Sequence, residues 1–158
     1  MNNLSALKEQ YAKLGEEITK LQDKEDNVWP KVGEDYFFLS GNGEKCWACW
    51  VGGAYDKLRQ SIGNIYRSTE DLDKQLETLK VIAELRACEG RKSFVVDEAN
   101  YCIVPDYEDR TVVVHTNYVS DCGWQSIYFN SQEAVQNAIN KVGADRILAA
   151  STWLAMGK

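Results

Sequence analysis

The sequence is poor in histidine, proline and methionine, and it contains no long apolar segment. Its 158 residues include one histidine, two prolines and two methionines. Because no run of about eighteen apolar residues occurs, we expect no segment that crosses a membrane. The chain starts with Met1-Asn2-Asn3 and passes directly into an amphipathic pattern, so we also expect no secretory signal peptide. These absences predict a cytoplasmic protein.

Positive charge is also scarce. Lysine and arginine total 18 against 24 aspartates and glutamates, which gives a net charge of −6. Proteins that hold nucleic acid or anionic membrane through charge need clustered lysine and arginine. We therefore expect neither direct nucleic-acid binding nor membrane binding. The acidity either keeps the protein soluble or lets it occupy a basic channel in another protein.

Motifs that carry catalysis or hold cofactors are missing. The sequence contains neither a phosphate-binding Walker loop nor the glycine fingerprint of a dinucleotide site. His115, the only histidine, follows a valine-rich β segment without the serine and aspartate pattern of a hydrolase. No pair of carboxylates has a spacing that distinguishes it. The sequence therefore predicts a protein that is not an enzyme and uses no cofactor.

The cysteines include one C-x-x-C pair, formed by Cys46 and Cys49, without a second such pair. A structural zinc site needs four ligands, and a redox pair needs a helix start that lowers a thiol pKa. The pair here lies in a predicted strand. We expect the cysteines to be small buried apolar residues that hold no metal, with a metal site and a redox pair as the alternatives. The remaining three are Cys88, Cys102 and Cys122.

Residues 2–26 predict a helix with a heptad seam. Apolar side chains recur at alternating spacings of three and four residues, which places them along one face of a helix. The seam comprises Leu4, Leu7, Tyr11, Leu14, Ile18 and Leu21. We expect residues 1–28 to form an amphipathic, coiled-coil-like helix through which the protein self-associates. Packing of this helix on its own domain is the alternative.

The segment 35–88 predicts a hairpin, a short helix, a short strand and a long helix. These elements are Tyr36–Leu39 with Lys45–Val51, 55–62, Ile65–Arg67, and Ser68 to about Cys88. The second hairpin strand is apolar on both faces, so we expect it to be covered on both sides. Ser68 is the expected N-cap of the long helix. Its expected core face consists of Leu72, Leu76, Leu79 and Ala83.

The segment 101–143 repeats this order after a connector at 90–92. Its elements are strands at 101–104, 111–116 and 127–129, and a helix capped by Asn130 and Glu133 that ends at Gly143. A last helix is expected over 145–156. The repeated order indicates a pseudo-repeat, although a strand, a polar cap and a helix are also a common local combination.

Together these segments predict an α+β fold. The N-terminal heptad helix is followed by a single domain over residues 29–158. Two pseudo-repeated hairpin–strand–helix units, 35–88 and 101–143, make up that domain together with the C-terminal helix.

The segments Gly63–Glu70 and Ile127–Ala134 share a strand–helix motif, in which an aromatic strand residue precedes a polar cap and a glutamate. This motif resembles a module found in small uncharacterised proteins of phages and prophages. The resemblance covers roughly residues 35–150 and carries no catalytic signature. It implies a phage or mobile-element origin and a role inside the infected cell, and the group includes host-takeover and counter-defence factors.

Aromatic and basic residues gather in the first half of the domain. Aromatic faces stack on nucleobases, and arginine pairs with phosphate. The candidate ligand-binding residues are Trp47, Trp50, Tyr55, Arg59, Asn64 and Arg67. They would hold a nucleotide-like ligand between subunits. The alternative is a tryptophan-rich core with solvated arginines.

These features predict a non-enzymatic, phage-type binding protein that inhibits a host protein, of a defence system in particular, in the bacterial cytoplasm. The alternative is an oligomeric sponge that sequesters a nucleotide-like signalling ligand. An enzyme is the third hypothesis. The sequence names neither the partner protein nor the ligand.

Overall fold

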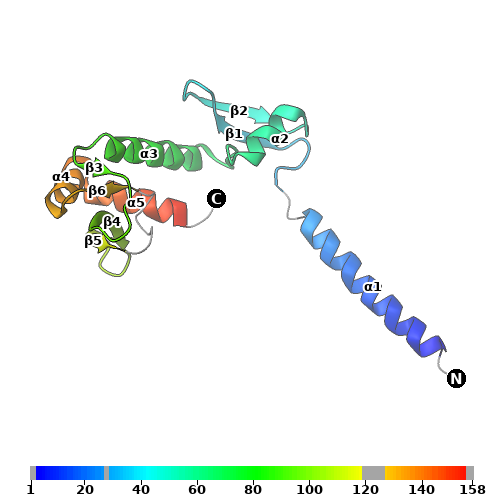
Figure 1. The fold of residues 1–158 in the computed structure, drawn as a ribbon. Helices are drawn as coiled ribbons and strands as arrows, with labels where there is room; N and C mark the ends of the chain where they lie inside the picture. Colours follow the sequence, from blue (N-terminus) through cyan, green and yellow to red (C-terminus); the bar gives the residue numbers. More distant parts are fainter. Residues whose placement is uncertain (1–2, 27–28, 119–126, 156–158) are drawn as a thin grey trace.

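The computed structural model of the chain describes residues 3–26, 29–118 and 127–155. These ranges contain five helices and two small antiparallel sheets, which confirms the predicted α+β class. Figure 1 shows an N-terminal helix, a small unit around the first sheet, and a larger unit of helices around the second sheet. In the described ranges, no helix combines the length and the apolar character needed to span a membrane.

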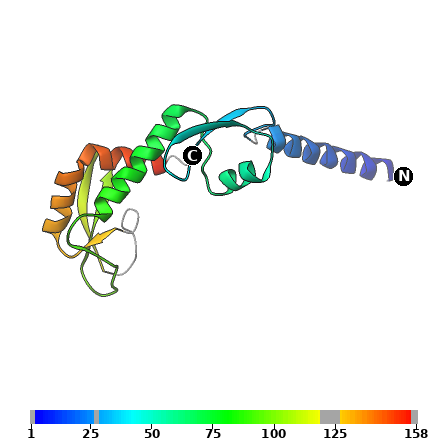
Figure 2. The same ribbon diagram turned by 90° about the horizontal axis from the view of Figure 1, so that it is seen from above.

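Helix α1 (Asn3–Asp26) is the predicted N-terminal helix, and it stands apart from the other elements in Figures 1 and 2. Of the seam residues, Tyr11, Leu14 and Ile18 are 74%, 54% and 48% exposed. The side chains of Leu4, Leu7 and Leu21 lie outside the described residues. The alternative that this helix packs on its own domain is therefore wrong for the described part of the seam.

The hairpin unit consists of strands β1 (Asp35–Leu39) and β2 (Lys45–Cys49), helix α2 (Ala54–Ser61) and Tyr66. The two strands pair antiparallel. The strand predicted at Ile65–Arg67 is reduced to one isolated bridge between Tyr66 and Phe37.

The outer face of β2 is open, contrary to the prediction that this strand is covered on both sides. Trp47 is 67% exposed, and Val51, just beyond the strand, is 70% exposed. Helix α2 lies on one side of the two-stranded sheet (Figure 1), and α3 contacts β1 and pairs through Asp73 with Lys45, but neither helix covers Trp47. Cys49 is exposed for the same reason, so its predicted burial is wrong; Cys88 and Cys102 are buried, and Cys122 lies outside the described residues.

Helix α3 (Thr69–Arg86) begins at the predicted cap, because the Ser68 side chain accepts a hydrogen bond from the Asp71 backbone N–H. Its buried face differs from the predicted one. Leu79 and Ala83 are exposed, whereas Gln75 and Thr78 are buried. Both polar side chains have hydrogen-bond partners: Thr78 donates to a backbone carbonyl of its own helix, and Gln75 accepts from the Trp153 indole. Polar side chains can be buried when their donors and acceptors are hydrogen-bonded in this way.

The second sheet has the strand order β3-β6-β4-β5, and all of its neighbouring strands are antiparallel. Its strands are β3 (Arg91–Lys92), β4 (Asn100–Asp106), β5 (Thr111–Asn117) and β6 (Tyr128–Phe129). The predicted connector at 90–92 therefore contains a strand. Although β6 has only two residues, it lies inside the sheet, between β3 and β4.

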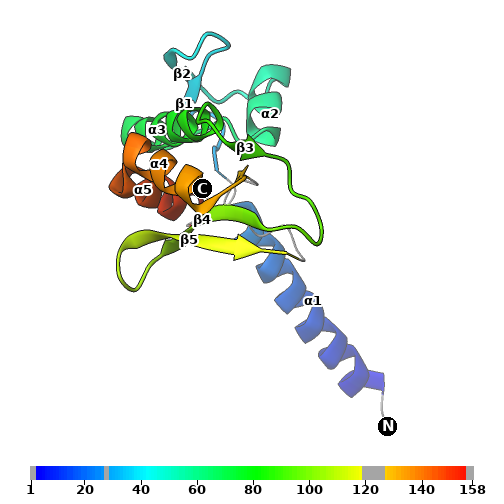
Figure 3. The same ribbon diagram turned by 60° about the vertical axis from the view of Figure 1, so that its left-hand side comes forward.

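Helices α4 (Gln132–Val142) and α5 (Ala144–Ala155) lie between α3 and the β4–β5 hairpin, as Figure 3 shows. The cap of α4 is Ser131 rather than the predicted Asn130, since the Ser131 side chain accepts from the Ala134 backbone N–H. One apolar core joins these helices to the sheet. Its fully buried members include Val81, Leu85, Phe129, Val135 and Ile147.

Arg146 links α5 to α3. Its guanidinium forms ion pairs with Glu77 at 2.7 Å and Glu84 at 2.8 Å, two positions that lie about two turns apart on the same side of α3. The hydrogen bond from Arg146 holds the pKa of the Glu84 carboxyl below its usual range. This pairing fixes the orientation of α5 against α3 along the edge of the apolar core.

Gly90 and Gly43 provide a matched test of the fold, because both have positive φ angles, of 75° and 82°. A Cβ atom at Gly90 would lie 2.7 Å from the Ala134 Cβ and 2.9 Å from the Asn130 Oδ1, whereas nothing lies within 4 Å at Gly43. We expect Gly43→Ala to cost about 1–2 kcal/mol from backbone strain alone. Gly90→Ala should cost about 1–3 kcal/mol more, because α4 must shift. Urea unfolding of both variants measures the difference, and equal losses would contradict the close packing of Gly90 against Asn130 and Ala134.

Candidate functional site

The hairpin unit is organised around the hydroxyl of Tyr36, a fully buried side chain. This hydroxyl donates a hydrogen bond to Asp56 Oδ1 at 2.7 Å and accepts one from Arg59 Nη1 at 2.7 Å. The Arg59 guanidinium also lies over the Phe38 ring, 3.7 Å from its centroid. Two residues of α2 are therefore fixed to β1 by hydrogen bonds and by a cation–π contact.

Asp56 also joins the start of α2 to the end of β2. Its Oδ2 atom accepts hydrogen bonds from the backbone N–H groups of Val51 at 3.0 Å and Gly53 at 3.1 Å. The hydrogen bond from Tyr36, followed by that from Val51, lowers the pKa of the Asp56 carboxyl. Burial raises the pKa of the Tyr36 hydroxyl. The network therefore contains an ionised carboxylate and a neutral phenol.

Asn64 plays a structural role comparable to that of a strand residue. Its side-chain amide accepts from the Leu39 backbone N–H at 2.9 Å and donates to the Leu39 carbonyl at 2.7 Å. Both backbone groups at the end of β1 are thereby satisfied. Asn64 and Arg59, two of the predicted ligand-binding residues, thus make hydrogen bonds within the hairpin unit.

The other four predicted ligand-binding residues have different surroundings. Trp50 is buried against Tyr36 with an edge-to-face ring contact, whereas Trp47 and Tyr55 are exposed. The exposed Arg67 lies with its guanidinium 4.9 Å from the centre of the Trp29 ring.

The hairpin places Trp47 and Arg59 on opposite sides. Trp47 is the cross-strand neighbour of Phe37, so the two side chains share one face of the sheet. Arg59 contacts Phe38, and the side chain of Phe38 points to the other face because successive strand residues alternate. The structure therefore does not gather the six residues at one point. Nucleotide binding by them stays a prediction.

A different surface of the hairpin unit is apolar and exposed. Tyr55, Leu58 and Ile62 follow one side of α2 and are 76%, 57% and 66% exposed. This side leads into a groove of about 600 Å³ between α2, the β1–β2 turn and α3, which is lined by Ile62, Leu76 and Leu79 among others. We call Tyr55, Leu58, Ile62 and Leu79 the α2 surface.

The α2 surface was missed by sequence reasoning. The helix period correctly places Tyr55, Leu58 and Ile62 on one side of α2, but the side that faces the hairpin carries Asp56 and Arg59. A polar pair one turn apart beside a tyrosine-containing strand is the signal that could have identified the inner side. Leu79 was assigned to the core face of α3 and is instead 45% exposed.

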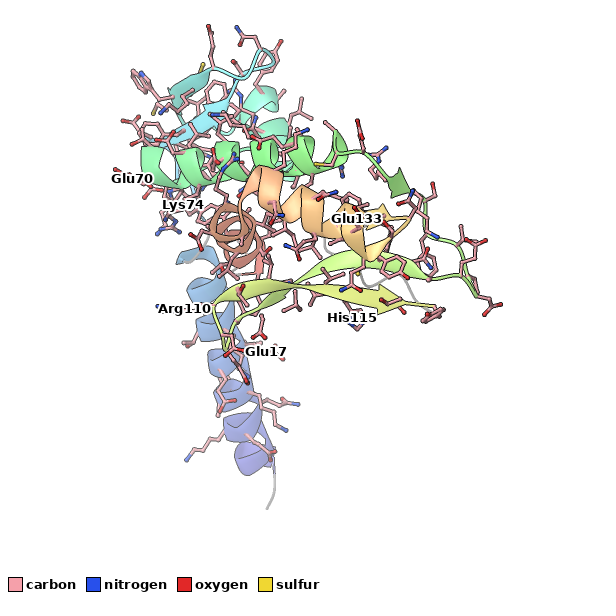
Figure 4. All side chains as sticks on the ribbon, turned by 90° about the vertical axis from the view of Figure 1, so that its left-hand side faces the viewer. Glu17, Glu70, Lys74, Arg110, His115 and Glu133 are labelled. Carbon is pink, nitrogen blue, oxygen red and sulfur yellow. The ribbon has the colours of Figure 1, made fainter. Side chains whose placement is uncertain are left out.

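Metal coordination and similarity to known proteins give no further information about this site. Within the described ranges, no three metal-binding side chains gather closely enough to hold an ion. His115 is exposed on β5, as Figure 4 shows. Comparison of the chain with protein-family models, with curated proteins and with solved structures finds no match. The chemistry of the α2 surface therefore carries the functional argument.

Asp56 generates a pH-dependent prediction. Its pKa is lower in the folded protein than the value of about 3.9 for an unfolded aspartate. Its stabilising contribution is therefore complete above that value and is lost as the pH falls through the folded-state pKa. We expect Asp56→Asn to be less stable than the wild type at pH 7, and the difference in unfolding free energy to shrink towards pH 2.

Urea unfolding between pH 7 and pH 2 measures this difference. Glu108→Gln, which removes a carboxylate exposed in the β4–β5 turn, is the control and should follow the wild type at every pH. A gap between the wild type and Asp56→Asn that stays constant with pH would contradict the role given to the carboxylate.

Proposed function

We propose that this is a non-enzymatic binding protein that inhibits a host protein inside the bacterial cytoplasm. The α2 surface carries the proposal. Contiguous exposed apolar side chains on a soluble protein mark sites of protein interaction, and tyrosine is enriched at such sites. The rigid network of Tyr36, Asp56 and Arg59 holds α2 in place, so the surface is formed before a partner binds.

The chemistry of the chain restricts the kind of host protein that would bind. The net charge of −6 favours a target with an apolar centre and basic surroundings, since complementary charge accelerates encounter and excludes wrong partners. Many nucleic-acid-handling proteins have such basic surfaces. The segments Gly63–Glu70 and Ile127–Ala134 resemble a phage module. This resemblance favours a protein of a host defence system as the target.

We also propose that α1 mediates self-association. The exposed side chains of Tyr11, Leu14 and Ile18 lie at the predicted seam positions of this isolated helix. A helix with an exposed apolar stripe gains stability by burying that stripe against another helix. A second copy of α1 satisfies this requirement, because the heptad pattern is complementary to itself.

Leu14→Glu tests this assembly. An unpaired charge in an apolar seam costs several kcal/mol, so the variant should be a monomer. Ala12→Glu adds the same charge outside the seam and should leave the assembly intact. Light scattering of both variants and the wild type gives the molar masses, and a monomeric wild-type protein would contradict the proposal.

The duplicated architecture is a further proposal that several structural details support. Tyr66 bridges to Phe37, 29 residues earlier, and Phe129 pairs with Tyr101, 28 residues earlier. In each case a serine cap follows two residues later, at Ser68 and Ser131. The fourth residue after each cap, Leu72 or Val135, is fully buried. We infer that two copies of one hairpin–strand–helix unit diverged, and that the first kept an exposed surface.

The inhibitory function is tested by relief, which here means the increase in phage plating on bacteria that carry a defence system. The protein is expressed in strains that each carry one defence system, and the plating efficiency of a sensitive phage is measured. We expect the wild type to raise plating by at least about 100-fold against one system. Leu58→Asp with Ile62→Asp should abolish relief, because charges within the α2 surface prevent apolar contact. Both side chains are more than half exposed, so folding should be unaffected.

Lys57→Asp is the matched control, since it also lowers the net charge by two, on the exposed polar side of the same helix. This variant should keep full relief. Relief that survives Leu58→Asp with Ile62→Asp would contradict the role of the α2 surface. The absence of relief against every system would contradict the inhibitory function.

A sponge for a nucleotide-like ligand is the alternative proposal. The exposed guanidinium of Arg67 over Trp29 and the exposed ring of Trp47 favour it, because stacked arginine and tryptophan can hold a base and a phosphate. Arg59 and Asn64 support it less, since their side chains are engaged within the hairpin unit. Loss of phage relief in Arg67→Ala, with relief retained in Leu58→Asp with Ile62→Asp, would favour the sponge over the inhibitor.

A further inference from the structure

A cavity of about 780 Å³ lies between α3, α5 and the turn that joins β4 to β5. This volume is within the range of small-molecule sites. Its walls are mainly apolar and include Leu148, Ala149 and Trp153 of α5. The cavity belongs to the layered part of the molecule and shares no residue with the α2 surface.

Trp153 forms a fixed wall of this cavity. Its indole N–H donates to the Gln75 side chain at 3.1 Å, so the ring is held in one orientation against α3. A large, flat, preoriented apolar surface favours a ligand with a flat apolar body, since little side-chain entropy is lost when the ligand binds.

Two basic side chains lie at the cavity on either side of α5. Figure 4 shows Lys74 on α3 and Arg110 at the turn between β4 and β5. Lys74 lies 5.1 Å from the centre of the Trp153 ring, and its contact with Asp71 is long, at 3.5 Å. In the described part of the chain, Arg110 has no ion pair or hydrogen bond through its side chain.

Two of the three carboxylates that line the cavity pair with cations from outside it. Asp73 pairs with Lys45 at 2.8 Å, and Glu77 pairs at 2.7 Å with Arg146, which also pairs with Glu84. Asp145 remains, and it lies in the first turn of α5, where the helix dipole offsets a negative charge. Positive charge at Lys74 and Arg110 is therefore left for a ligand, on a chain whose net charge is −6.

We infer that the cavity between α3, α5 and the β4–β5 turn binds an organic anion, with the flat apolar body against Trp153 and the anionic group attracted by the positive charges of Lys74 and Arg110. The ligand class is an aromatic or otherwise flat carboxylate, sulfonate or phosphate. This site is separate from the α2 surface, so ligand binding there does not depend on whether the protein inhibits a host protein.

The probe for this site is 1-anilinonaphthalene-8-sulfonate, which combines fused rings with one sulfonate and fluoresces when bound. We expect one probe per wild-type chain. Lys74→Gln with Arg110→Gln should weaken binding by about tenfold, because charge-assisted contacts to the sulfonate are lost. Arg110→Gln alone should weaken it several-fold, and this variant leaves the contact between Lys74 and Trp153 intact. The neutral analogue N-phenyl-1-naphthylamine should bind equally to all of these proteins.

Three controls decide the outcome. Lys80→Gln with Arg86→Gln removes the same two charges from exposed positions of α3 outside the cavity and should bind like the wild type. Ala149→Phe fills the cavity and should abolish binding. Leu58→Asp with Ile62→Asp should leave binding unchanged. Any of three results would overturn the assignment. The two charge-removal variants could bind the probe with equal affinity, Ala149→Phe could still bind it, or Leu58→Asp with Ile62→Asp could lose it.

Discussion

The larger unit depends on the burial of two residues. Tyr128 and Phe129 form β6, which pairs with β3 on one side and with β4 on the other, and neither side chain reaches solvent appreciably. A strand this short makes few hydrogen bonds, so its position is set chiefly by apolar burial, which contributes about 2–3 kcal/mol for each large side chain. The Ser131 cap, α4 and α5 follow β6 directly along the chain. Arg146 then connects α5 to α3. Displacement of β6 would therefore disturb every layer of this unit.

The hairpin unit is stabilised in a different way, because it is too small to enclose a large apolar core. It relies on the hydrogen bonds of Tyr36 with Asp56 and Arg59, on the pairing of Asn64 with Leu39, and on the stacking of Arg59 over Phe38. These polar contacts occupy the inner side of α2. The apolar side chains of α2 are consequently left at the surface, so the same arrangement that folds the unit also creates its exposed surface.

The elements of this fold were easier to predict from the sequence than their buried faces. Caps and periodicity identify helices well, as Ser68 does for α3, because these signals are local. The β3 strand could not be found in this way, since Arg91 and Lys92 show no apolar alternation and pair only with a distant segment. Gln75 and Thr78 were missed as buried residues because their burial depends on hydrogen bonds within α3 and to α5. At the candidate site, the spacing of Trp47 and Trp50 already placed them on opposite faces of a strand. The inner side of α2 was harder to predict, because it is set by the hydrogen bonds of Asp56 and Arg59 to Tyr36, which lies 20 or more residues earlier in the chain.

The strand order of the second sheet has a consequence for synthesis of the chain on the ribosome. Arg91 of β3 pairs with Phe129, 38 residues later. At a translation rate of about 5–20 residues per second, β6 is synthesised roughly 2–8 seconds after β3, so β3 has no pairing partner during that time. The apolar side chains Val81 and Leu85 of α3 wait longer, until Ile147 has been added. The backbone pairing of the hairpin unit, in contrast, is complete once Tyr66 has left the exit tunnel. The nascent chain therefore presents a closed hairpin followed by a helix whose apolar face is uncovered, and this face is the surface that a ribosome-associated chaperone would encounter.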